Sequence, residues 1–197
     1  MSLEDSLKAY DLKLDSSFFA SCEVFKNLLQ KWGRVHNLSA NLQKDEIDLN
    51  IIDSVYPLSF VDSFSSFADI GSGVGYPGLI LAFARKDISA YLIEPRVKRV
   101  AFLNFVKASL KLENLHIIEA RVENVKDLRV DLITSRAVTN TKLLLQLTQN
   151  IKKENSSYLF YKGSMLETEL QDLELENYKI VTKDDRNYLY IKGENGL

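Results

Sequence analysis

The stretch DIGSGVGYPG, which runs from Asp69 to Gly78, contains four glycines in ten residues. An apolar run that begins at Phe67 precedes it, and a second apolar run, LILAFA at 79–84, follows it. Glycine is concentrated where the backbone needs a positive φ or where a ligand approaches the main chain closely. Pro77 suits the first position of a helix, because proline lacks an N–H there. The stretch therefore predicts a strand, a glycine-rich loop that binds a ligand, and a helix.

Length and composition favour one globular domain with a modest extension. The chain has 197 residues, of which 46% are hydrophobic and 26% are charged, which is ordinary for a soluble protein. No apolar run approaches the roughly 18 residues that span a bilayer. The acidic start MSLED lacks the order of a secretion signal. We therefore expect a cytoplasmic protein without membrane contact.

Cysteine, histidine and net charge limit the possible chemistry. Cys22 is the only cysteine and the chain has two histidines, so neither a disulfide nor a metal site is expected. The net charge of −2 argues against general nucleic-acid binding. Any contact with RNA must then come from a local basic cluster.

The chain divides into a helical part and an alternating part. Residues 1–62 show helical spacing, with Ser2 as a first cap, a helix ending at Gly33 and a third helix over 45–56. This N-terminal extension has too few apolar residues for a core of its own. Residues 63–197 form the second part, which we expect to be one structural unit.

Strands and helices alternate from Phe67 onward. Such alternation predicts an α/β fold with a mostly parallel sheet. A charged turn at 183–186 joins the last two strands as a hairpin. The expected strands cover 67–70, 90–93, 116–119, 131–134, 158–161, 178–182 and 188–192.

The glycine pattern favours S-adenosylmethionine (SAM) over a dinucleotide, without excluding the dinucleotide. In such a sheet the ligand lies at the carboxyl ends of the strands. A G-x-G-x-x-G motif counted from Gly71 is interrupted by Tyr76, although it is satisfied from Gly73. The D-x-G-x-G-x-G pattern from Asp69 to Gly75 is typical of SAM sites. Asp69 can serve the ammonium of SAM, directly or through water. A tight turn without a ligand is the remaining alternative.

Glu94 follows the second expected strand, where an acid can accept both hydroxyls of a ribose. This residue supports a ribose but does not choose between SAM and NAD.

The region after the fourth expected strand excludes several methyl transfers. Transfer to cytosine C5 needs a cysteine there, and Cys22 lies elsewhere. Transfer to an exocyclic amine usually has an (N/D)-P-P-(Y/F/W) turn, where this chain has TSRAV at 134–138. A guanine ring nitrogen has a lone pair and needs no base, so positioning can supply most of the rate enhancement. Arg136 or Lys162 can hold the acceptor or its phosphate, or either can be a surface ion-pair residue.

Ordered motifs along nearly the whole chain resemble the RsmG (GidB) family of small-subunit rRNA guanine-N7 methyltransferases. They are FADIGSGVGYPG at 67–78, KRVAFL at 98–103, ARVE at 120–123, SRA at 135–137, YKG at 161–163, NLS at 37–39 and DS at 53–54. The family often has histidine at the position of Asn50, and Phe or Leu at that of Tyr76.

The resemblance implies a Rossmann-like class I SAM-dependent methyltransferase fold, with a seven-stranded, mostly parallel sheet and an N-terminal helical extension. It implies SAM-dependent methylation of guanine N7 in 16S rRNA, at position 527 in the 530 loop. The partner is then the small ribosomal subunit, and we expect the protein to be a monomer.

The resemblance also assigns roles to residues. The cofactor-binding residues are Asp69, Gly71, Gly73, Gly75, Tyr76, Glu94, Val122, Glu123 and Arg136. The catalytic residues are Arg136 and Lys162. The RNA-binding residues are Lys98, Arg99, Arg121 and Lys162, and Arg96, Lys107 and Lys111 extend this basic cluster into a phosphate patch.

Three other functions are consistent with parts of the sequence. A methyltransferase of a protein or small molecule shares the glycine loop and Glu94, but gives no role to the cluster around Lys98. A non-catalytic RNA-binding or assembly factor with a SAM fold retains the cluster. A nicotinamide dehydrogenase retains only the loop and the acid.

Overall fold

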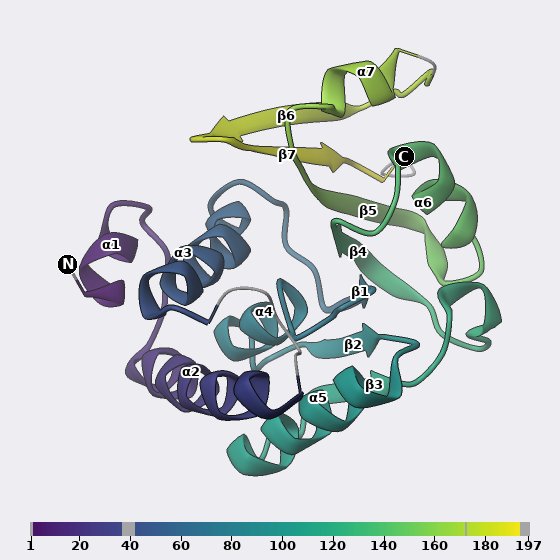
Figure 1. Ribbon diagram of the computed structural model, residues 1–197. Coiled ribbons are helices and arrows are strands. Elements are labelled where there is room, and N and C mark those ends of the chain that lie inside the picture. The colour runs from purple at the N-terminus through teal and green to yellow at the C-terminus, as the bar shows by residue number, and fades with distance from the viewer. Residues whose placement is uncertain (1, 37–41, 172, 194–197) are drawn as a thin grey trace.

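The computed structural model describes residues 2–36, 42–171 and 173–193. Its helices pack around one sheet, with the N-terminal helices on one side (Figure 1). The predicted motif at 37–39 lies outside the described residues.

The N-terminal part is helical, as predicted. Its elements are α1 (Leu3–Lys8), α2 (Ser16–His36), α3 (Lys44–Val55) and the short 3-10 helix η1 (Tyr56–Ser59). Ser2 caps α1, because its hydroxyl accepts the N–H of Asp5. The prediction that Gly33 ends a helix is wrong, since α2 continues to His36. A Cβ on Gly33 would lie 2.6 Å from the Leu42 side chain, so this glycine permits close packing.

The described residues contain a seven-stranded sheet in the order β3-β2-β1-β4-β5-β7-β6. Its strands are β1 (Ser66–Ile70), β2 (Ser89–Ile93), β3 (Leu115–Ile118), β4 (Val130–Arg136), β5 (Lys152–Lys162), β6 (Tyr178–Lys183) and β7 (Arg186–Ile191). Among these, β7 is antiparallel to both of its neighbours and the other pairings are parallel. The α/β fold with a mostly parallel sheet is therefore confirmed. The expected strand at 158–161 lacked the first six residues of β5, 152–157, because that part of the strand is mostly polar.

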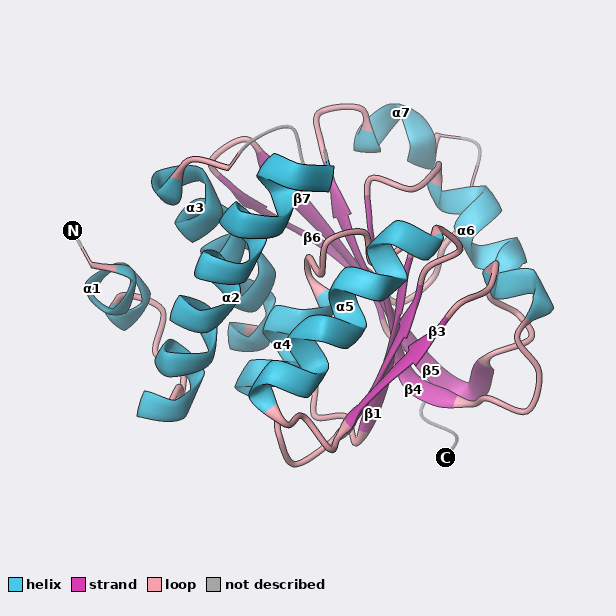
Figure 2. Ribbon diagram, turned by 60° about the horizontal axis from the view of Figure 1, so that its bottom comes forward, coloured by secondary structure: helices cyan, strands magenta, loops and turns pink. Residues whose placement is uncertain are grey.

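Helices cover both faces of the sheet (Figure 2). They are α4 (Gly78–Ala84), α5 (Val97–Leu110), α6 (Thr141–Leu147), α7 (Leu166–Leu170) and the 3-10 helix η2 (Val122–Asn124). One core cluster joins α2 and α3 to α4, α5 and one sheet face, and contains Phe25, Ile51 and Phe102. A second cluster fills the opposite face. The N-terminal helices thus complete the first core, and the division at 62/63 stays a prediction.

The register of the strands places three segments side by side. Ile70 pairs with Ile93 on β2 and with Ser135 on β4. The next residue of each segment, Gly71, Glu94 and Arg136, therefore lies at one level at the carboxyl edge. The chain leaves β1 toward β2 on one side and β4 on the other, which is the switch point where α/β proteins bind ligands.

Candidate active site

The glycine loop adopts backbone conformations that its residues were predicted to need. The φ angles are +67° at Gly71, +61° at Gly73 and +113° at Gly75, which side chains with a Cβ rarely tolerate. The N–H of Gly71 donates to the carbonyl of Ile93 at 2.8 Å, and that of Gly75 to the carbonyl of Ser72 at 2.8 Å. The loop is therefore fixed to the end of β2.

A cavity of about 650 Å³ opens beside this loop at the carboxyl edge. Its walls come from five segments: the loop at 70–76, the end of β2 with the start of α5, the segment 120–123, the segment 136–138 at the end of β4, and Leu147 at the end of α6. Predicted site residues that line it are Gly71, Gly73, Tyr76, Glu94, Arg99, Arg121, Val122, Glu123 and Arg136. Asp69, Gly75, Lys98 and Lys162 lie outside this lining.

Glu94 is a buried carboxylate at the cavity wall, with 1% of its surface exposed. Its Oε2 accepts the N–H of Gly73 at 2.8 Å, and its Oε1 accepts the N–H of Arg96 at 2.9 Å. A guanidinium nitrogen of Arg99 lies 3.6 Å from Oε2. Each carboxylate oxygen can accept a further hydrogen bond, so both oxygens retain capacity for a hydroxyl from the cavity.

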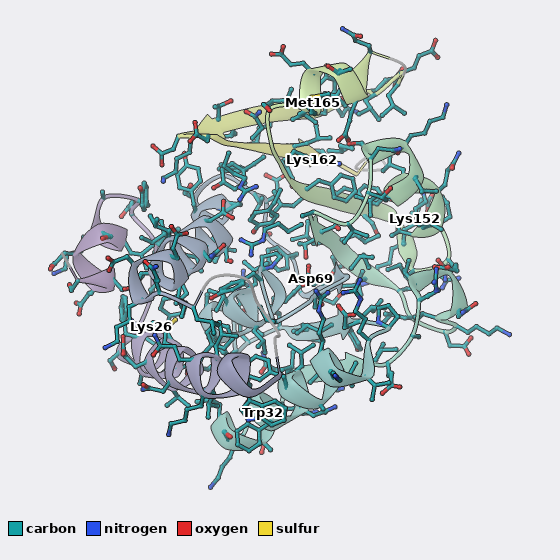
Figure 3. All side chains as sticks on the ribbon, viewed as in Figure 1. Lys26, Trp32, Asp69, Lys152, Lys162 and Met165 are labelled. Carbon is teal, nitrogen blue, oxygen red and sulfur yellow. The ribbon has the colours of Figure 1, made fainter. Side chains whose placement is uncertain are left out.

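Asp69 lies behind the loop, deep in the molecule (Figure 3). Its side chain is fully buried, accepts the hydroxyl of Thr134 at 2.9 Å and accepts the N–H of Gly78 at 3.1 Å. Burial raises the pKa of this carboxyl to about 6. These contacts connect β1, β4 and the start of α4, so Asp69 holds the loop from below, and its predicted contact with the SAM ammonium stays a prediction.

Arg136 reaches the cavity from the last residue of β4. Its guanidinium lies 4.8 Å from the centre of the Tyr76 ring, a favourable cation–π distance. It donates to Asn50 Oδ1 at 2.8 Å and to Asp53 Oδ2 at 3.0 Å. Two residues of α3 thus orient this cation.

Asp53 is a site residue that sequence reasoning left without a role. Besides the hydrogen bond from Arg136, its carboxylate accepts one from Nε–H of Arg186 at 3.0 Å and one from the hydroxyl of Tyr188 at 2.8 Å. The carboxylate therefore joins α3, β4 and β7. Its position in the DS motif at 53–54 was the available signal, but three partners distant in sequence cannot be read from a motif.

Lys162, the last residue of β5 and labelled in Figure 3, is buried and paired, and it lies outside the cavity lining. Its Nζ donates to the carbonyl of Thr139 at 3.0 Å and to Glu169 Oε2 at 2.7 Å. The same Glu169 oxygen accepts the N–H and the hydroxyl of Thr141, each at 2.8 Å. Lys162 and Glu169 thereby fasten both ends of the segment 139–141, which follows the cavity residues Ala137 and Val138.

The predicted RNA-binding cations differ in exposure. Lys98 and Arg121 are exposed and Arg99 is half-buried at the cavity wall, whereas Lys162 is buried. Arg121 lies 4.0 Å from Glu123, which is also largely exposed. The described residues contain no group of three potential metal ligands and no helix long and apolar enough to cross a membrane.

The cavity suits a nucleoside. Glu94 offers acceptors for ribose hydroxyls, and the apolar residues Val122, Ile93 and Leu147 offer a surface for a flat ring. The volume of about 650 Å³ lies within the usual range of small-molecule sites. The residues that line the cavity therefore fit SAM, and the assignment of Glu94 to the ribose and of Val122 to the adenine stays a prediction.

Solved structures with the same fold are methyltransferases. A protein of Methanococcus maripaludis described as a putative SAM-dependent methyltransferase has a TM-score of 0.60 at 15% identity, over 89% of this chain and 93% of that chain. The 16S rRNA N2 G1207 methyltransferase RsmC of T. thermophilus, in complex with AdoMet and guanosine, has a TM-score of 0.58 at 13% identity. That match covers 79% of this chain and 44% of the other. The predicted class I methyltransferase fold is thus confirmed.

Sequence relatives are more specific. A protein of Aliarcobacter butzleri named ribosomal RNA small subunit methyltransferase G is 66% identical, over 97% of this chain and 98% of its own length. Its namesake in Wolinella succinogenes is 43% identical over 98% of each chain. The model of the family GidB, rRNA small subunit methyltransferase G, matches residues 19–192. The chain therefore belongs to the rRNA small subunit methyltransferase G (GidB) family, which confirms the resemblance inferred from its motifs and, with it, a SAM-dependent methyltransferase.

Proposed function

We propose that this protein methylates N7 of one guanine in 16S rRNA, at position 527 in the 530 loop, with SAM as the methyl donor. The observation that carries this proposal is the cavity at the carboxyl edge, in a chain whose residues 19–192 match the family of rRNA small subunit methyltransferase G. The substrate is then 16S rRNA or the small ribosomal subunit, and we expect the enzyme to act in the cytoplasm, where ribosomes are assembled.

The cavity lining supports an acceptor that needs no deprotonation. The described residues that line it include no cysteine, histidine or lysine. Cys22 is fully buried in α2, and burial raises the pKa of its thiol. Bound SAM supplies an electrophilic methyl group on a sulfonium. Guanine N7 has an in-plane lone pair and carries no proton, so the transfer creates a cationic base and releases no proton.

Positioning is then the work of the protein. Glu94 would hold the ribose and Val122 would contact the adenine. Arg136, held by Asn50 and Asp53, would place the acceptor nucleotide through its phosphate or O6. We infer a smaller role in chemistry for Lys162, because its ammonium is already paired with Glu169.

Deletion of the gene tests the assignment. Small-subunit rRNA from the deletion strain should lack one N7-methylguanine that the parent strain contains. Mass spectrometry of nuclease fragments would detect the loss, and chemical cleavage at N7-methylguanine would place the position. Wild-type protein should restore the modification and an Arg136→Ala variant should not. An intact modification in the deletion strain would contradict the proposal.

A second experiment identifies the form of the substrate. Purified protein with labelled SAM would be offered naked 16S rRNA and assembled 30S particles in parallel. Transfer to neither, with SAM binding intact, would favour a non-catalytic assembly factor. Sedimentation of the same preparation would test the expected monomer.

A further inference from the structure

An apolar stripe lies on the outer face of α5. Val97 is 64% exposed and Phe105 is 42% exposed, and Ala101 between them is also exposed. Positions four apart lie on the same side of a helix, so the three side chains form one row. Eight residues span roughly 12 Å along the helix axis. Single exposed apolar residues are common, but a row of three on a helix next to a ligand cavity calls for a partner.

The ring of Phe105 is supported from behind. Its centre lies 5.2 Å from that of Trp32 on α2, with 31° between the two planes. Trp32 in turn contacts the buried Phe102 at 5.7 Å. Because α2 packs against α5 (Figure 2), the orientation of Phe105 is fixed before a partner arrives. A fixed aromatic surface costs little conformational entropy on binding.

The charges around the stripe select an acidic partner. The segment 96–111 contains five cations and no acid, in a chain of net charge −2. Lys98 adjoins Val97 at one end, and Lys107 and Lys111 follow Phe105 at the other. Arg96 and Arg99, at the start of the helix, line the cavity. The stripe therefore continues from the mouth of the cavity along a basic surface.

We propose that the outer face of α5 binds unpaired nucleotides that flank the target guanine, with Phe105 stacking on one base. Phosphates would be held by Lys98, which projects from the same side of the helix as Phe105. This inference rests on the proposed function and names a contact outside the methyl-transfer cavity. Unpaired RNA bases bind aromatic side chains by stacking, while cations follow the backbone. A row of roughly 12 Å matches three to four stacked nucleotides, at about 3.4 Å each.

Binding of an RNA hairpin with the 530-loop sequence, measured by fluorescence anisotropy at several salt concentrations, tests the proposal. Phe105→Ala should weaken binding about 5- to 100-fold, without changing the slope of log Kd against log salt. Lys98→Ala should instead reduce that slope by about 0.7, the value for one phosphate contact on a single strand. Phe105→Tyr should restore affinity and Phe105→Leu should not, because leucine is apolar but cannot stack.

Tyr178→Ala is the matched control, since Tyr178 is an aromatic residue on β6 with 46% exposure. It should leave RNA affinity unchanged. Thermal unfolding and SAM titration would show that Phe105→Ala remains folded and binds the cofactor.

Three results would overturn the proposal: unchanged affinity in Phe105→Ala, full affinity in Phe105→Leu, or a wild-type dimer that Phe105→Ala converts to monomer. The last would identify the face as a contact between two copies. Failure of the wild type to methylate both naked 16S rRNA and 30S particles would instead overturn the proposed function, and the hairpin titration would still decide whether Phe105 binds RNA.

Discussion

Four charged residues at the carboxyl edge of the sheet divide into two pairs. Glu94 and Arg136 line the cavity, whereas Asp69 and Lys162 lie behind its walls. Burial does not separate the pairs, because Glu94 is 1% exposed and Lys162 is 8% exposed. Strand register separates them. The residue type found at the end of a strand is thus a weaker guide to function than the register position of that residue and the side of the sheet to which its side chain points.

Register explains each case. Asp69 pairs with Leu92, two positions before Glu94, and therefore lies roughly 6.6 Å deeper in the sheet. Arg136 pairs with Tyr161, so Lys162 is one residue beyond that level. Because side chains alternate between faces along a strand, Arg136 and Lys162 point to opposite sides. Arg136 points into the cavity, whereas Lys162 holds the segment 139–141.

The largest effect is expected from Arg136→Ala. Turnover should fall 100-fold or more, which corresponds to about 3 kcal/mol of transition-state stabilisation. Asp53 would keep Arg186 and Tyr188 as partners, so the variant should fold, as thermal unfolding would show. Single-turnover assays on 30S particles would measure the rate. Lys126→Ala removes an exposed cation outside the cavity lining, and as the control it should retain turnover. An equal loss of turnover in Lys162→Ala would contradict the inference that Arg136 acts on the substrate and Lys162 does not.

Glu94→Gln should come next and act on cofactor binding. An amide would lose the acceptor for either the Gly73 or the Arg96 N–H, and one acceptor for the ribose. We expect the Kd for SAM to rise about 10- to 100-fold, since hydrogen bonds to charged groups contribute about 1.5–3 kcal/mol. Calorimetric titration would measure it, with the exposed Glu113→Gln as control. A titration with NAD in place of SAM should show no binding.

Much of this arrangement was predictable from residue patterns. The glycine loop, the acid after β2 and the alternation of strands and helices are local in sequence, so they predicted the fold class and the position of the cavity. Partners distant in sequence were not predictable. Asn50 and Asp53 lie more than 80 residues before Arg136, and no local pattern joins them.

The role of Lys162 shows the same limit. Its position at the end of β5 suggested a cation for substrate, but only the register of β4 and β5 places it on the other face. Its partner Glu169 belongs to a short helix whose docking depends on tertiary packing.

Glu169→Gln tests the ion pair of Lys162 and Glu169 that holds the segment 139–141, and it should have a moderate effect on stability and turnover. Burial alone would raise the pKa of this carboxyl, but hydrogen bonds from Lys162 and Thr141 lower it below its usual value. Removing the charge leaves a buried ammonium without its anion, so the free energy of unfolding should fall by about 2 kcal/mol. Turnover should fall less than tenfold, because the loop at 139–141 shifts without losing a cavity residue.

The double variant Glu169→Gln/Lys162→Met distinguishes a structural role of Lys162 from a catalytic role. Replacing both charges should recover part of the lost stability, since neither group is then left unpaired. Recovery of turnover in the same double variant would show that Lys162 acts through position. If the double variant regains stability but loses as much turnover as Arg136→Ala, Lys162 has a direct role in catalysis.

The smallest effect on methyl transfer is expected from Asp69→Asn, whose signature is pH-dependent stability. The folded pKa of about 6 lies above the ordinary value of 3.8, so the folded protein binds this proton more tightly than the unfolded chain. The resulting stabilisation is complete below pH 4 and is lost as the pH rises through 6, on the order of 3 kcal/mol. Denaturant unfolding between pH 4 and 7 should therefore show that the wild type loses stability relative to Asp69→Asn. SAM affinity should change less than in Glu94→Gln, because Asp69 supports the loop from below the cavity. A larger loss of affinity than in Glu94→Gln, with parallel stability curves, would instead place its carboxylate on the cofactor.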